Sequence, residues 1–573
     1  MASLSTDNRR RPARLAWLFN PPIGRSRPAA RPRDWLELVA AFAVIWLFFR
    51  LLYSEVPTDD VALYAAKLEA DAFDWKVFHI FLQPAALIWH RLFGDGADVV
   101  ASMAQINTLS AAIGLAIFYL LLSRLGYGLW LRIAVAGLAV VSFNVLALAP
   151  TPHIKMLALP FLALALYHAV LWEHEAVGGG RVVNWYRLTM SAAALGMSTA
   201  FLVTGITVLP FIALGILLIC HRAGRGWQHG LAPMLAYGTI CCGIGAAAMF
   251  VGYVADVGQP GGPFDFIGYV LGQIAQKHGN AFARDFGVVD RLARGAYALV
   301  YNYVFTPDLG PVMRARLWGQ IDSLAPYAWE LARDMVPFIL TIAVVGVTYV
   351  AAGLRLLTGG FPVVVPLAFL VGHVGFAITT NVNDPEIWFQ VTFPTLLLFA
   401  QLPGGSAVAV AATVWLLMVG TVNLSLYSVP RALYPLSAHE ADMQARFGAD
   451  DLIVHFATYA GRPDISFFSL PGIPRLKLDR TLIDSRFDPA VLPEAKAQID
   501  GTLEAGGRVI AFRIFDERDW DAPWLKFAGH GMPKRKLIGF FRQHYEITPI
   551  GSLAGLDAWE LTMRPATSQS TTN

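Results

Sequence analysis

Long apolar runs follow one another from about residue 36 to residue 426 and then stop. A helix needs about 20 apolar residues to cross the hydrocarbon core of a bilayer, and a spanning segment must satisfy its backbone polar groups internally. The chain is 56% hydrophobic and only 15% charged, whereas soluble proteins usually have about 25% charged residues. The pattern predicts a polytopic α-helical membrane domain followed by a small soluble domain.

About eleven membrane spans are expected from the apolar windows. Two short windows are separated only by Thr204-Gly205 and could form one broken helix, so the count is open by one or two. The windows lie near residues 36–53, 101–122, 130–149, 154–172, 188–202, 204–220, 231–254, 335–357, 361–379, 388–402 and 406–426.

The first 35 residues carry eight arginines and many prolines. This composition predicts a disordered basic tail, which the positive-inside rule places in the cytoplasm. No small-residue cleavage site ends the first apolar run, so we expect a retained span and not a removed signal peptide. Nucleic-acid binding by the arginines is the alternative, and it is disfavoured because the first span begins directly after them.

An odd number of spans then places the C-terminal domain outside the cell, in the periplasm if the cell is Gram-negative. We expect the protein to lie in the inner (plasma) membrane. Loops expected on the cytoplasmic side carry arginine pairs, while the first external loop is mostly acidic, as the rule requires of short loops. External loops are expected at 54–100 and 255–334 of a membrane domain spanning 36–430. The second loop should hold short amphipathic helices on the membrane surface.

The region 437–565 has a different pattern that predicts a small α/β domain, followed by a disordered tail at 566–573. Strand-like apolar runs occupy 452–457 and 509–515, and 493–505 has helical spacing that ends at Gly506-Gly507. The runs 545–550 and 559–563 are expected to pair as closing strands.

Two adjacent carboxylates, Asp59 and Asp60, stand just outside the first predicted span. Thr58 can N-cap a helix from Asp59 to about Ala72, with an apolar face (Val61, Tyr64, Ala65 and Leu68) that could lie on the bilayer. Acidic residues favour the first turn of any helix, so locally the pair has an ordinary explanation. An acidic residue at membrane depth is nevertheless a functional candidate.

Cations in the same and later external loops could bind a phosphate. Lys76, His79 and Gln83 share a spacing of i, i+3 and i+7, which places them on one helical face, where they could hold an anion. An interfacial anchor explains the same residues equally well. Lys155, beside His153 at the mouth of the fourth span, and Lys277 in the long loop are further candidates.

A third external loop, 381–390, is polar and aromatic. Trp388 could stack on a sugar face, and Asp384 and Glu386 could bind its hydroxyl groups. An ordinary interfacial loop would have a similar composition. The candidates from all three loops fall on the same side of the membrane, and this convergence favours a common site more than any one residue does.

The order of these features resembles the GT-C membrane glycosyltransferases, closest to the ArnT/PMT-like branch. The resemblance rests on Thr58-Asp59-Asp60, the amphipathic helix behind them, Gln83-Pro84 and the segment Arg91–Gly94, and it covers roughly residues 36–220. Many relatives have a Pro-Pro pair where this chain has Gln83-Pro84, and the loop 381–390 lacks their His-x-Arg-Tyr.

The resemblance implies transfer of a sugar from a polyprenyl-phosphate carrier to a glycolipid, polysaccharide or protein acceptor on the external face, with inversion at the anomeric carbon. Asp59 or Asp60 would be the general base. Lys76, Lys155 and Lys277, with His79, would bind the lipid phosphate; Gln83, His153, Asp384, Glu386 and Trp388 would bind the sugar or acceptor. Some relatives bind a divalent cation here, but no residue spacing in this chain demands a metal.

Three other functions remain open. A transporter or flippase of lipid-linked sugars would favour inverted repeats and broken helices, and only the break at Thr204-Gly205 is of that kind. An O-antigen polymerase or ligase would also have many spans and a large external loop. The third alternative is a non-catalytic membrane scaffold.

Overall fold

The structure is a computed structural model of two compact units. The membrane unit comprises Met1–Tyr53, Leu63–Phe305 and Val336–Ser428, and the C-terminal unit comprises Ser54–Ala62, Thr306–Met335 and Val429–Asn573. The structure describes residues 32–56, 59–70, 79–94, 98–178, 182–258, 262–279, 287–309, 312–313, 316, 323–358, 362–380, 385–456, 468, 470–478, 481–482, 488, 490–512, 514–515 and 534–564.

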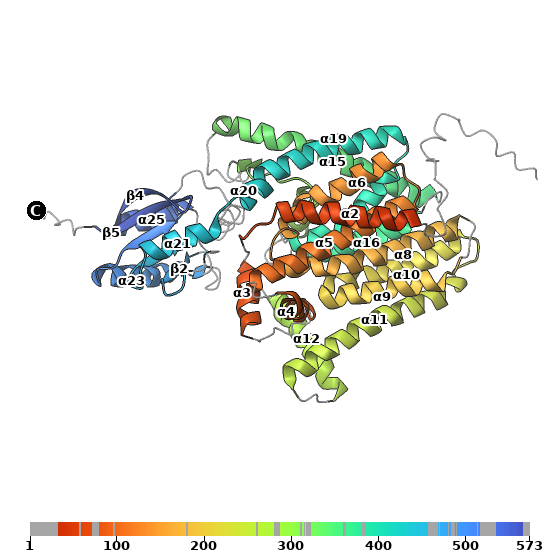
Figure 1. Ribbon diagram of the computed structural model, residues 1–573, viewed down its shortest axis with the longest axis horizontal. Coiled ribbons are helices and arrows are strands. Elements are labelled where there is room, and N and C mark those ends of the chain that lie inside the picture. The colour runs from red at the N-terminus through yellow and green to blue at the C-terminus, as the bar shows by residue number, and fades with distance from the viewer. Residues whose placement is uncertain are drawn as a thin grey trace, which may run out of the picture. The chain divides into compact units, whose positions relative to one another are not determined.

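The described part of the membrane unit is helical (Figure 1). Its elements are α2 (Pro32–Leu51), α4 (Leu82–Phe93), α5 (Val99–Arg124), α6 (Leu129–Val141), α7 (Phe143–Leu148), η1 (Ile154–Ala158), α8 (Leu159–Val177), α9 (Trp185–Phe201), η2 (Val203–Val208), α10 (Leu209–Arg222), α11 (Gln228–Val257), α12 (Pro263–Gly279), α13 (Val288–Tyr301), α16 (Val364–Thr380), α17 (Pro385–Trp388), η4 (Phe389–Val391), α18 (Thr392–Ala400), α19 (Ser406–Asn423) and η5 (Leu424–Ser428). Two helices, α3 (Asp59–Glu69) and α15 (Ala328–Thr358), cross the division between the units.

Within the described residues, six helices are long and apolar enough to cross a membrane. They start at Val99, Ile154, Val203, Gln228, Ala325 and Ser406. Other predicted windows fold as shorter helices: α9 and α16 have 17 residues each, and α6 ends after 13 residues at Ser142. The chain is therefore a multi-pass membrane protein, while the count of eleven spans stays a prediction.

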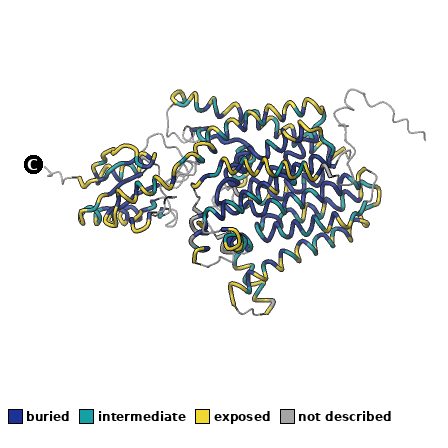
Figure 2. Tube along the Cα trace, viewed as in Figure 1, coloured by how far each residue is buried: buried dark blue, intermediate teal, exposed yellow. Residues whose placement is uncertain are grey.

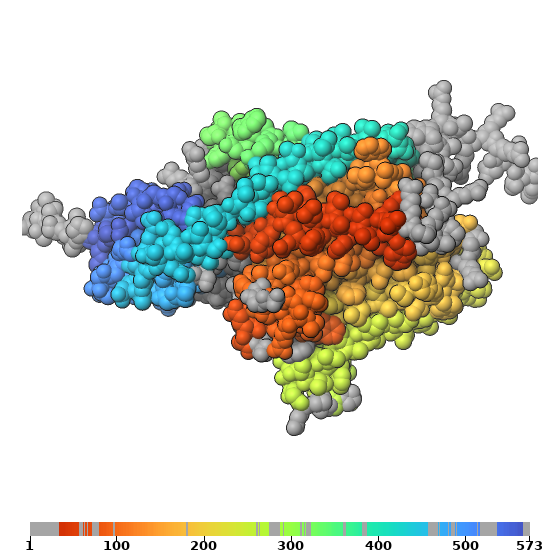
Figure 3. All heavy atoms as spheres, viewed as in Figure 1, coloured from red at the N-terminus to blue at the C-terminus, as the bar shows by residue number. Residues whose placement is uncertain are grey.

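Burial divides these helices into a centre and a periphery (Figure 2). Helices α5 and α8 contact each other and are mostly buried, and α2 packs on α5 while α9 packs on α8. Helices α11 and α15 expose most of their apolar surface, as lipid-facing helices do because lipid is as apolar as their side chains. Figure 3 shows α2 and α19 at the surface of this unit on one face.

Buried polar side chains hold the ends of these helices. Asp34 at the start of α2 pairs with Arg124 at the end of α5, with 3.1 Å between Oδ2 and Nη1. The carboxylate of Glu173 in α8 accepts hydrogen bonds of 2.8 and 2.9 Å from the backbone N–H groups of Val364 and Val365. Those groups belong to the first turn of α16, where helical partners are missing, so Glu173 caps a helix far away in sequence.

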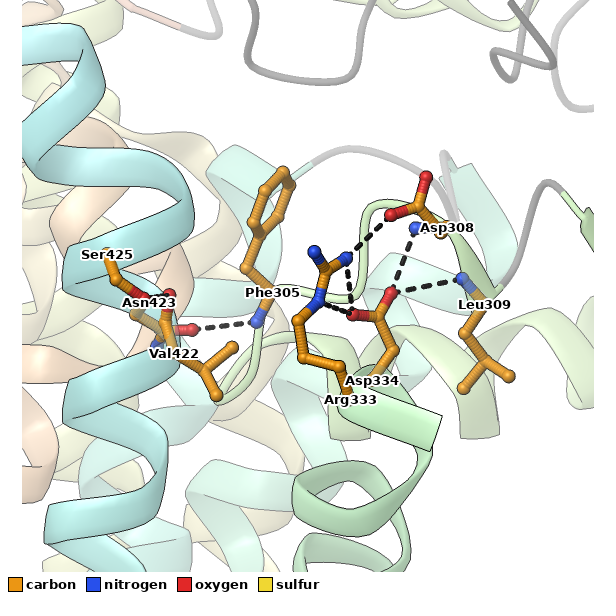
Figure 4. A network of polar contacts seen from close by, with 8 residues as sticks. All are labelled: Phe305, Asp308, Leu309, Arg333, Asp334, Val422, Asn423 and Ser425. Atoms are coloured by element: carbon orange, nitrogen blue, oxygen red, sulfur yellow. Dashed lines mark hydrogen bonds and ion pairs between the residues drawn. The ribbon is translucent and has the colours of Figure 1, made fainter. Parts of the chain in front are cut away.

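Asn423, near the end of α19, joins the end of α6 to the segment that follows α13. Its amide nitrogen donates to the carbonyls of Val141 and Tyr303, both at 2.7 Å, and its Oδ1 accepts the N–H of Phe305 at 2.8 Å (Figure 4). Each of these backbone groups lies where a helix ends or has ended, so the side chain replaces helical hydrogen bonds that the chain does not make.

The C-terminal unit contains η3 (Ala325–Tyr327), α20 (Val429–Ala432), α21 (Leu436–Arg446), β1 (Leu452–His455), β2 (Arg475–Lys477), α23 (Val491–Glu504), β3 (Val509–Phe512), α25 (Lys534–His544), β4 (Tyr545–Leu553) and β5 (Leu556–Met563). The sheet order is β2-β1-β3-β5-β4. The first three strands are parallel and the last three are antiparallel.

Alternation along the strands builds two apolar cores in this unit. Val454 and Ala511 face α23 and α25, while Ile453 and Phe512 face α21. The predicted strands at 452–457 and 509–515 correspond to β1 and β3, and the predicted closing pair corresponds to β4 and β5, which turn at Ala554-Gly555.

A separate ionic cluster in the C-terminal unit surrounds Asp334 (Figure 4). Asp334 Oδ2 accepts the backbone N–H groups of Asp308 and Leu309 at 2.9 and 3.1 Å. Arg333 bonds both Asp334 and Asp308, at 2.9 and 2.6 Å. The cluster fixes the start of the Asp308–Leu309 turn against the first turns of α15.

Candidate functional site

The predicted acidic pair begins a helix, as expected, because Asp59 and Asp60 are the first two residues of α3. Their side chains lie outside what the structure describes, as does Thr58. The predicted apolar face of this helix is buried by protein: Tyr64, Ala65 and Leu68 are each less than 9% exposed. The expectation that this face lies on the bilayer was therefore wrong. The sequence could not distinguish the two surroundings, because an apolar stripe can pack on protein as well as on lipid.

The segment between α7 and α8 carries His153 and Lys155, and both are buried, with 1% and 4% exposure. One side chain of α5 organises this segment. The amide of Asn107 donates to the carbonyls of Leu148 and Thr151 at 2.7 and 3.0 Å, and its Oδ1 accepts the N–H of Met156 at 3.0 Å. Asn107 thereby fixes the chain on both sides of His153 and Lys155.

Gln83 lies in the first turn of α4 and is buried, with 3% exposure. Helix α4 contacts η1, the turn that contains Lys155. The start of α4 is also joined to the end of α9, since the N–H of Phe81 donates to the carbonyl of Ala200 at 3.3 Å. Gln83 and Lys155 are therefore carried by neighbouring elements.

His79 does not share a helical face with Gln83, because α4 begins only at Leu82. Pro84 explains this start: proline is tolerated in the first turn of a helix, where its missing N–H needs no partner. The predicted spacing of i, i+3 and i+7 was therefore wrong for this pair. Lys76 lies outside the described residues.

A second junction joins η2 to η4. The hydroxyl of Thr204 donates to Oε1 of Gln390 at 2.7 Å, and both side chains are buried. Gly205, next to Thr204, packs so closely that an added Cβ would lie 2.8 Å from Thr199 Oγ1 in α9. The predicted break at Thr204-Gly205 is thus a 3₁₀ turn whose glycine permits close contact with α9.

The end of α9 brings these segments together. Both η1 and η2 contact α9, and η2 and η4 both contact α16. Three short 3₁₀ turns and the start of α4 thus carry or adjoin buried polar side chains among otherwise apolar helices: Gln83, His153, Lys155, Thr204 and Gln390. A buried cation and imidazole at membrane depth favour an anionic ligand, because charged side chains are costly there and usually functional.

Four other predicted residues are not placed in this group, three of them because the structure does not describe their side chains. Trp388 is only 1% exposed and packs in an apolar cluster with Ile387 and Leu398, so its ring is a core residue and we remove it from the sugar site. Asp384 lies outside the described residues. Glu386 in α17 and Lys277 in α12 have described backbones, but their side chains are not described.

Among the residues that the structure describes, no three His, Cys, Asp or Glu side chains lie close enough together to hold a metal ion.

Comparison with known proteins gave no match to a protein-family model. No curated protein sequence matches either. Several solved chains match, and two of them are crystal structures of one protein. The crystal structure of ArnT from Cupriavidus metallidurans bound to undecaprenyl phosphate is 11% identical, with a TM-score of 0.40 and coverage of 92% of this chain and 98% of that chain. The apo state of the same protein is also 11% identical, with a TM-score of 0.29 and coverage of 92% and 97%.

The chain is similar to ArnT along most of its length.

Sequence reasoning missed the residues that hold the site. Asn107 stands inside an apolar window, where a lone polar residue is a functional or structural signal, and that signal was available. The partnership of Thr204 with Gln390 joins residues 186 positions apart, and no local pattern encodes it.

Proposed function

We propose that this protein transfers a sugar from a polyprenyl-phosphate carrier to a glycolipid, polysaccharide or protein acceptor on the external face of the membrane, with inversion. The observation that carries the proposal is the burial of Lys155 and His153 beside α4, the helix that presents Gln83. An ionisable side chain buried among membrane helices is costly and marks a candidate functional site. A lipid phosphate is the anion that a membrane enzyme of this class would meet.

In the proposed reaction, the carboxylate of Asp59 or Asp60 takes the proton of the acceptor hydroxyl. The acceptor oxygen forms the new glycosidic bond at the anomeric carbon while the bond from that carbon to the phosphate oxygen breaks. The departing lipid phosphate carries the negative charge that develops, and the ammonium of Lys155 stabilises it. The proton ends on the aspartate, and the carrier leaves as polyprenyl phosphate.

The remaining predicted residues have supporting roles in this proposal. Lys76, His79 and Lys277 would add positive charge near the phosphate. Gln83, His153, Asp384 and Glu386 would hydrogen-bond to sugar or acceptor hydroxyl groups, as amide, imidazole and carboxylate side chains can.

A reconstituted system tests the proposal against the transporter alternative. The purified protein is placed in vesicles with undecaprenyl phosphate that is linked to a labelled pentose or hexose. An extract of envelope glycolipids and glycans supplies the acceptor. Undecaprenyl phosphate is the first carrier to try because one ArnT structure holds it. We expect label on the acceptor and release of undecaprenyl phosphate. Movement of intact labelled carrier between leaflets, without a labelled product, would overturn the proposal in favour of a flippase.

A further inference from the structure

We propose that Arg431 is a positioning residue that fixes the segment leading to Asp59 and Asp60. The inference rests on the proposed function, because it concerns how the proposed base is held in place. It adds a role for α20 (Val429–Ala432), which neither the sequence patterns nor the comparisons single out.

Arg431 contacts this segment through both its side chain and its backbone. Its Nη2 donates to the carbonyl of Val56 at 2.8 Å. Its own carbonyl accepts the hydroxyl of Ser54 at 3.1 Å. The same hydroxyl oxygen accepts the N–H of Val56 at 3.2 Å, so the three residues form a closed ring of hydrogen bonds.

The contacts of this ring are buried. Arg431, Ser54 and Val56 are 6%, 2% and 1% exposed. A hydrogen bond from a guanidinium is stronger than one from a neutral donor, and loss of a partner inside a protein leaves the remaining group unsatisfied. A weaker contact extends the ring at the surface, where Ser437 donates to Glu55 Oε2 at 2.8 Å.

Three consecutive residues, Ser54, Glu55 and Val56, are thus bonded to residues 431–437, which lie about 380 positions later in the chain. Val56 precedes Asp59 by three residues, which limits their separation to about 11 Å in a fully extended chain. The contacts also group Ser54–Ala62 with Val429–Asn573 in one compact unit. Arg431 is therefore the buried link between α20 and the segment that leads to the acidic pair.

The first test measures whether the ring holds Val56 and does not depend on activity. The full-length chain is prepared with Cys220, Cys241 and Cys242 replaced by alanine and with Val56→Cys added. A thiol-reactive maleimide should label the introduced cysteine slowly in the parent and at least about 10-fold faster in Arg431→Met, as expected if local opening costs at least about 1.4 kcal/mol less. Arg431→Lys should fall between them. Unchanged labelling in Arg431→Met would overturn the inference.

The matched control is Arg446→Met in α21, because Arg446 pairs at the surface with Asp442 of its own helix. This variant removes the same charge and should leave the introduced cysteine protected. Ser54→Ala is a milder second variant that opens the ring at its other side, should Arg431→Met not fold. It should also speed labelling, and a failure to do so would count against the ring.

The second test measures sugar transfer. Arg431→Met should lower kcat by roughly 10- to 100-fold, with KM for the donor unchanged, because a base displaced by about 1 Å loses this much rate. Arg431→Lys should recover part of kcat. Faster labelling of the introduced cysteine with unchanged kcat would overturn the positioning role. Failure of the proposed function has a different signature: the parent enzyme itself forms no labelled product.

Discussion

The hydroxyl of Thr204 donates a 2.7 Å hydrogen bond to Oε1 of Gln390, although the two residues are 186 positions apart. Both side chains are buried, and the bond joins the 3₁₀ turn before α10 to the one before α18. Together with the turn before α8, these turns bring buried polar groups to the end of α9. The proposed site of this membrane protein is therefore built from interruptions of its helices.

The Thr204–Gln390 bond should be measurable as a coupling energy. Thr204→Val and Gln390→Leu should each lower the unfolding temperature, and the double variant should lose less than the sum. A coupling of about 0.5–1.5 kcal/mol is expected for one buried hydrogen bond. Thermal unfolding of the four proteins in one detergent measures it. Strict additivity would mean that the two side chains do not interact.

Asn107 should be indispensable for donor binding, although it does not belong to the predicted site. Asn107→Ala removes the acceptor of the Met156 N–H and the donors to the carbonyls of Leu148 and Thr151. The expected loss of stability is about 2–4 kcal/mol, because buried backbone groups are left unsatisfied. Thermal unfolding and donor titration measure both effects.

The control for Asn107 is Thr413→Ala on α19, whose exposed hydroxyl donates to the carbonyl of Ala409 in its own helix. It should change neither quantity. If Asn107→Ala matched this control in stability and donor affinity, the segment that bears His153 and Lys155 would not depend on Asn107.

Loss of the Lys155 ammonium should chiefly weaken the binding of the lipid carrier. Lys155→Met should raise the Kd for undecaprenyl phosphate by about 10- to 100-fold, the loss of a charge-assisted contact, and Lys155→Arg should restore part of it. Equilibrium binding with a labelled carrier measures the change. Lys536→Met, on an exposed part of α25, removes the same charge elsewhere and should bind normally. Equal affinity of both variants would exclude Lys155 from the phosphate site.

The stability of the C-terminal unit should depend on pH through His455 in β1. Burial, reinforced by the nearby cations of Lys477 and Arg475, lowers the pKa of His455 from 6.5 to about 3. The unfolded chain binds a proton below pH 6.5 and the folded unit does not. The stabilisation is therefore complete above pH 6.5 and declines by up to about 1.4 kcal/mol per pH unit between pH 6.5 and 3.

Thermal unfolding of the full-length protein from pH 7.5 to 4.5 measures this dependence. His455→Phe should unfold with a shallower pH dependence than the wild type. His439→Phe is the matched control, because His439 is a partly buried histidine in α21 whose ring contacts that of Tyr434. Identical slopes for His455→Phe and the wild type would show that His455 is not the group responsible.

The sequence predicted where helices and strands occur better than what their surfaces touch. Apolar windows and strand alternation located most elements because hydrophobic periodicity is a local property. The same windows could not distinguish lipid from protein, since both accept apolar side chains; the face of α3 and the ring of Trp388 were assigned to the wrong surroundings for this reason.

The buried polar partners could not be read from the sequence. Asn107, Gln390, Thr204 and Arg431 make contacts over tens to hundreds of positions, and each is specified by packing and not by a neighbouring motif. The external position of Lys155 and His153 was inferred from span parity alone, whereas their burial beside α4 required the fold.

The proposed mechanism depends on a carboxylate of the first external loop that removes the proton from the acceptor. The most direct measurement is the turnover of purified Asp59→Asn and Asp60→Asn with a labelled undecaprenyl-phosphate sugar, compared with the wild type at equal carrier occupancy. We predict that at least one variant loses kcat by roughly 100-fold or more, as expected for loss of a general base, while its Kd for undecaprenyl phosphate stays the same. Full turnover by both variants would contradict the mechanism.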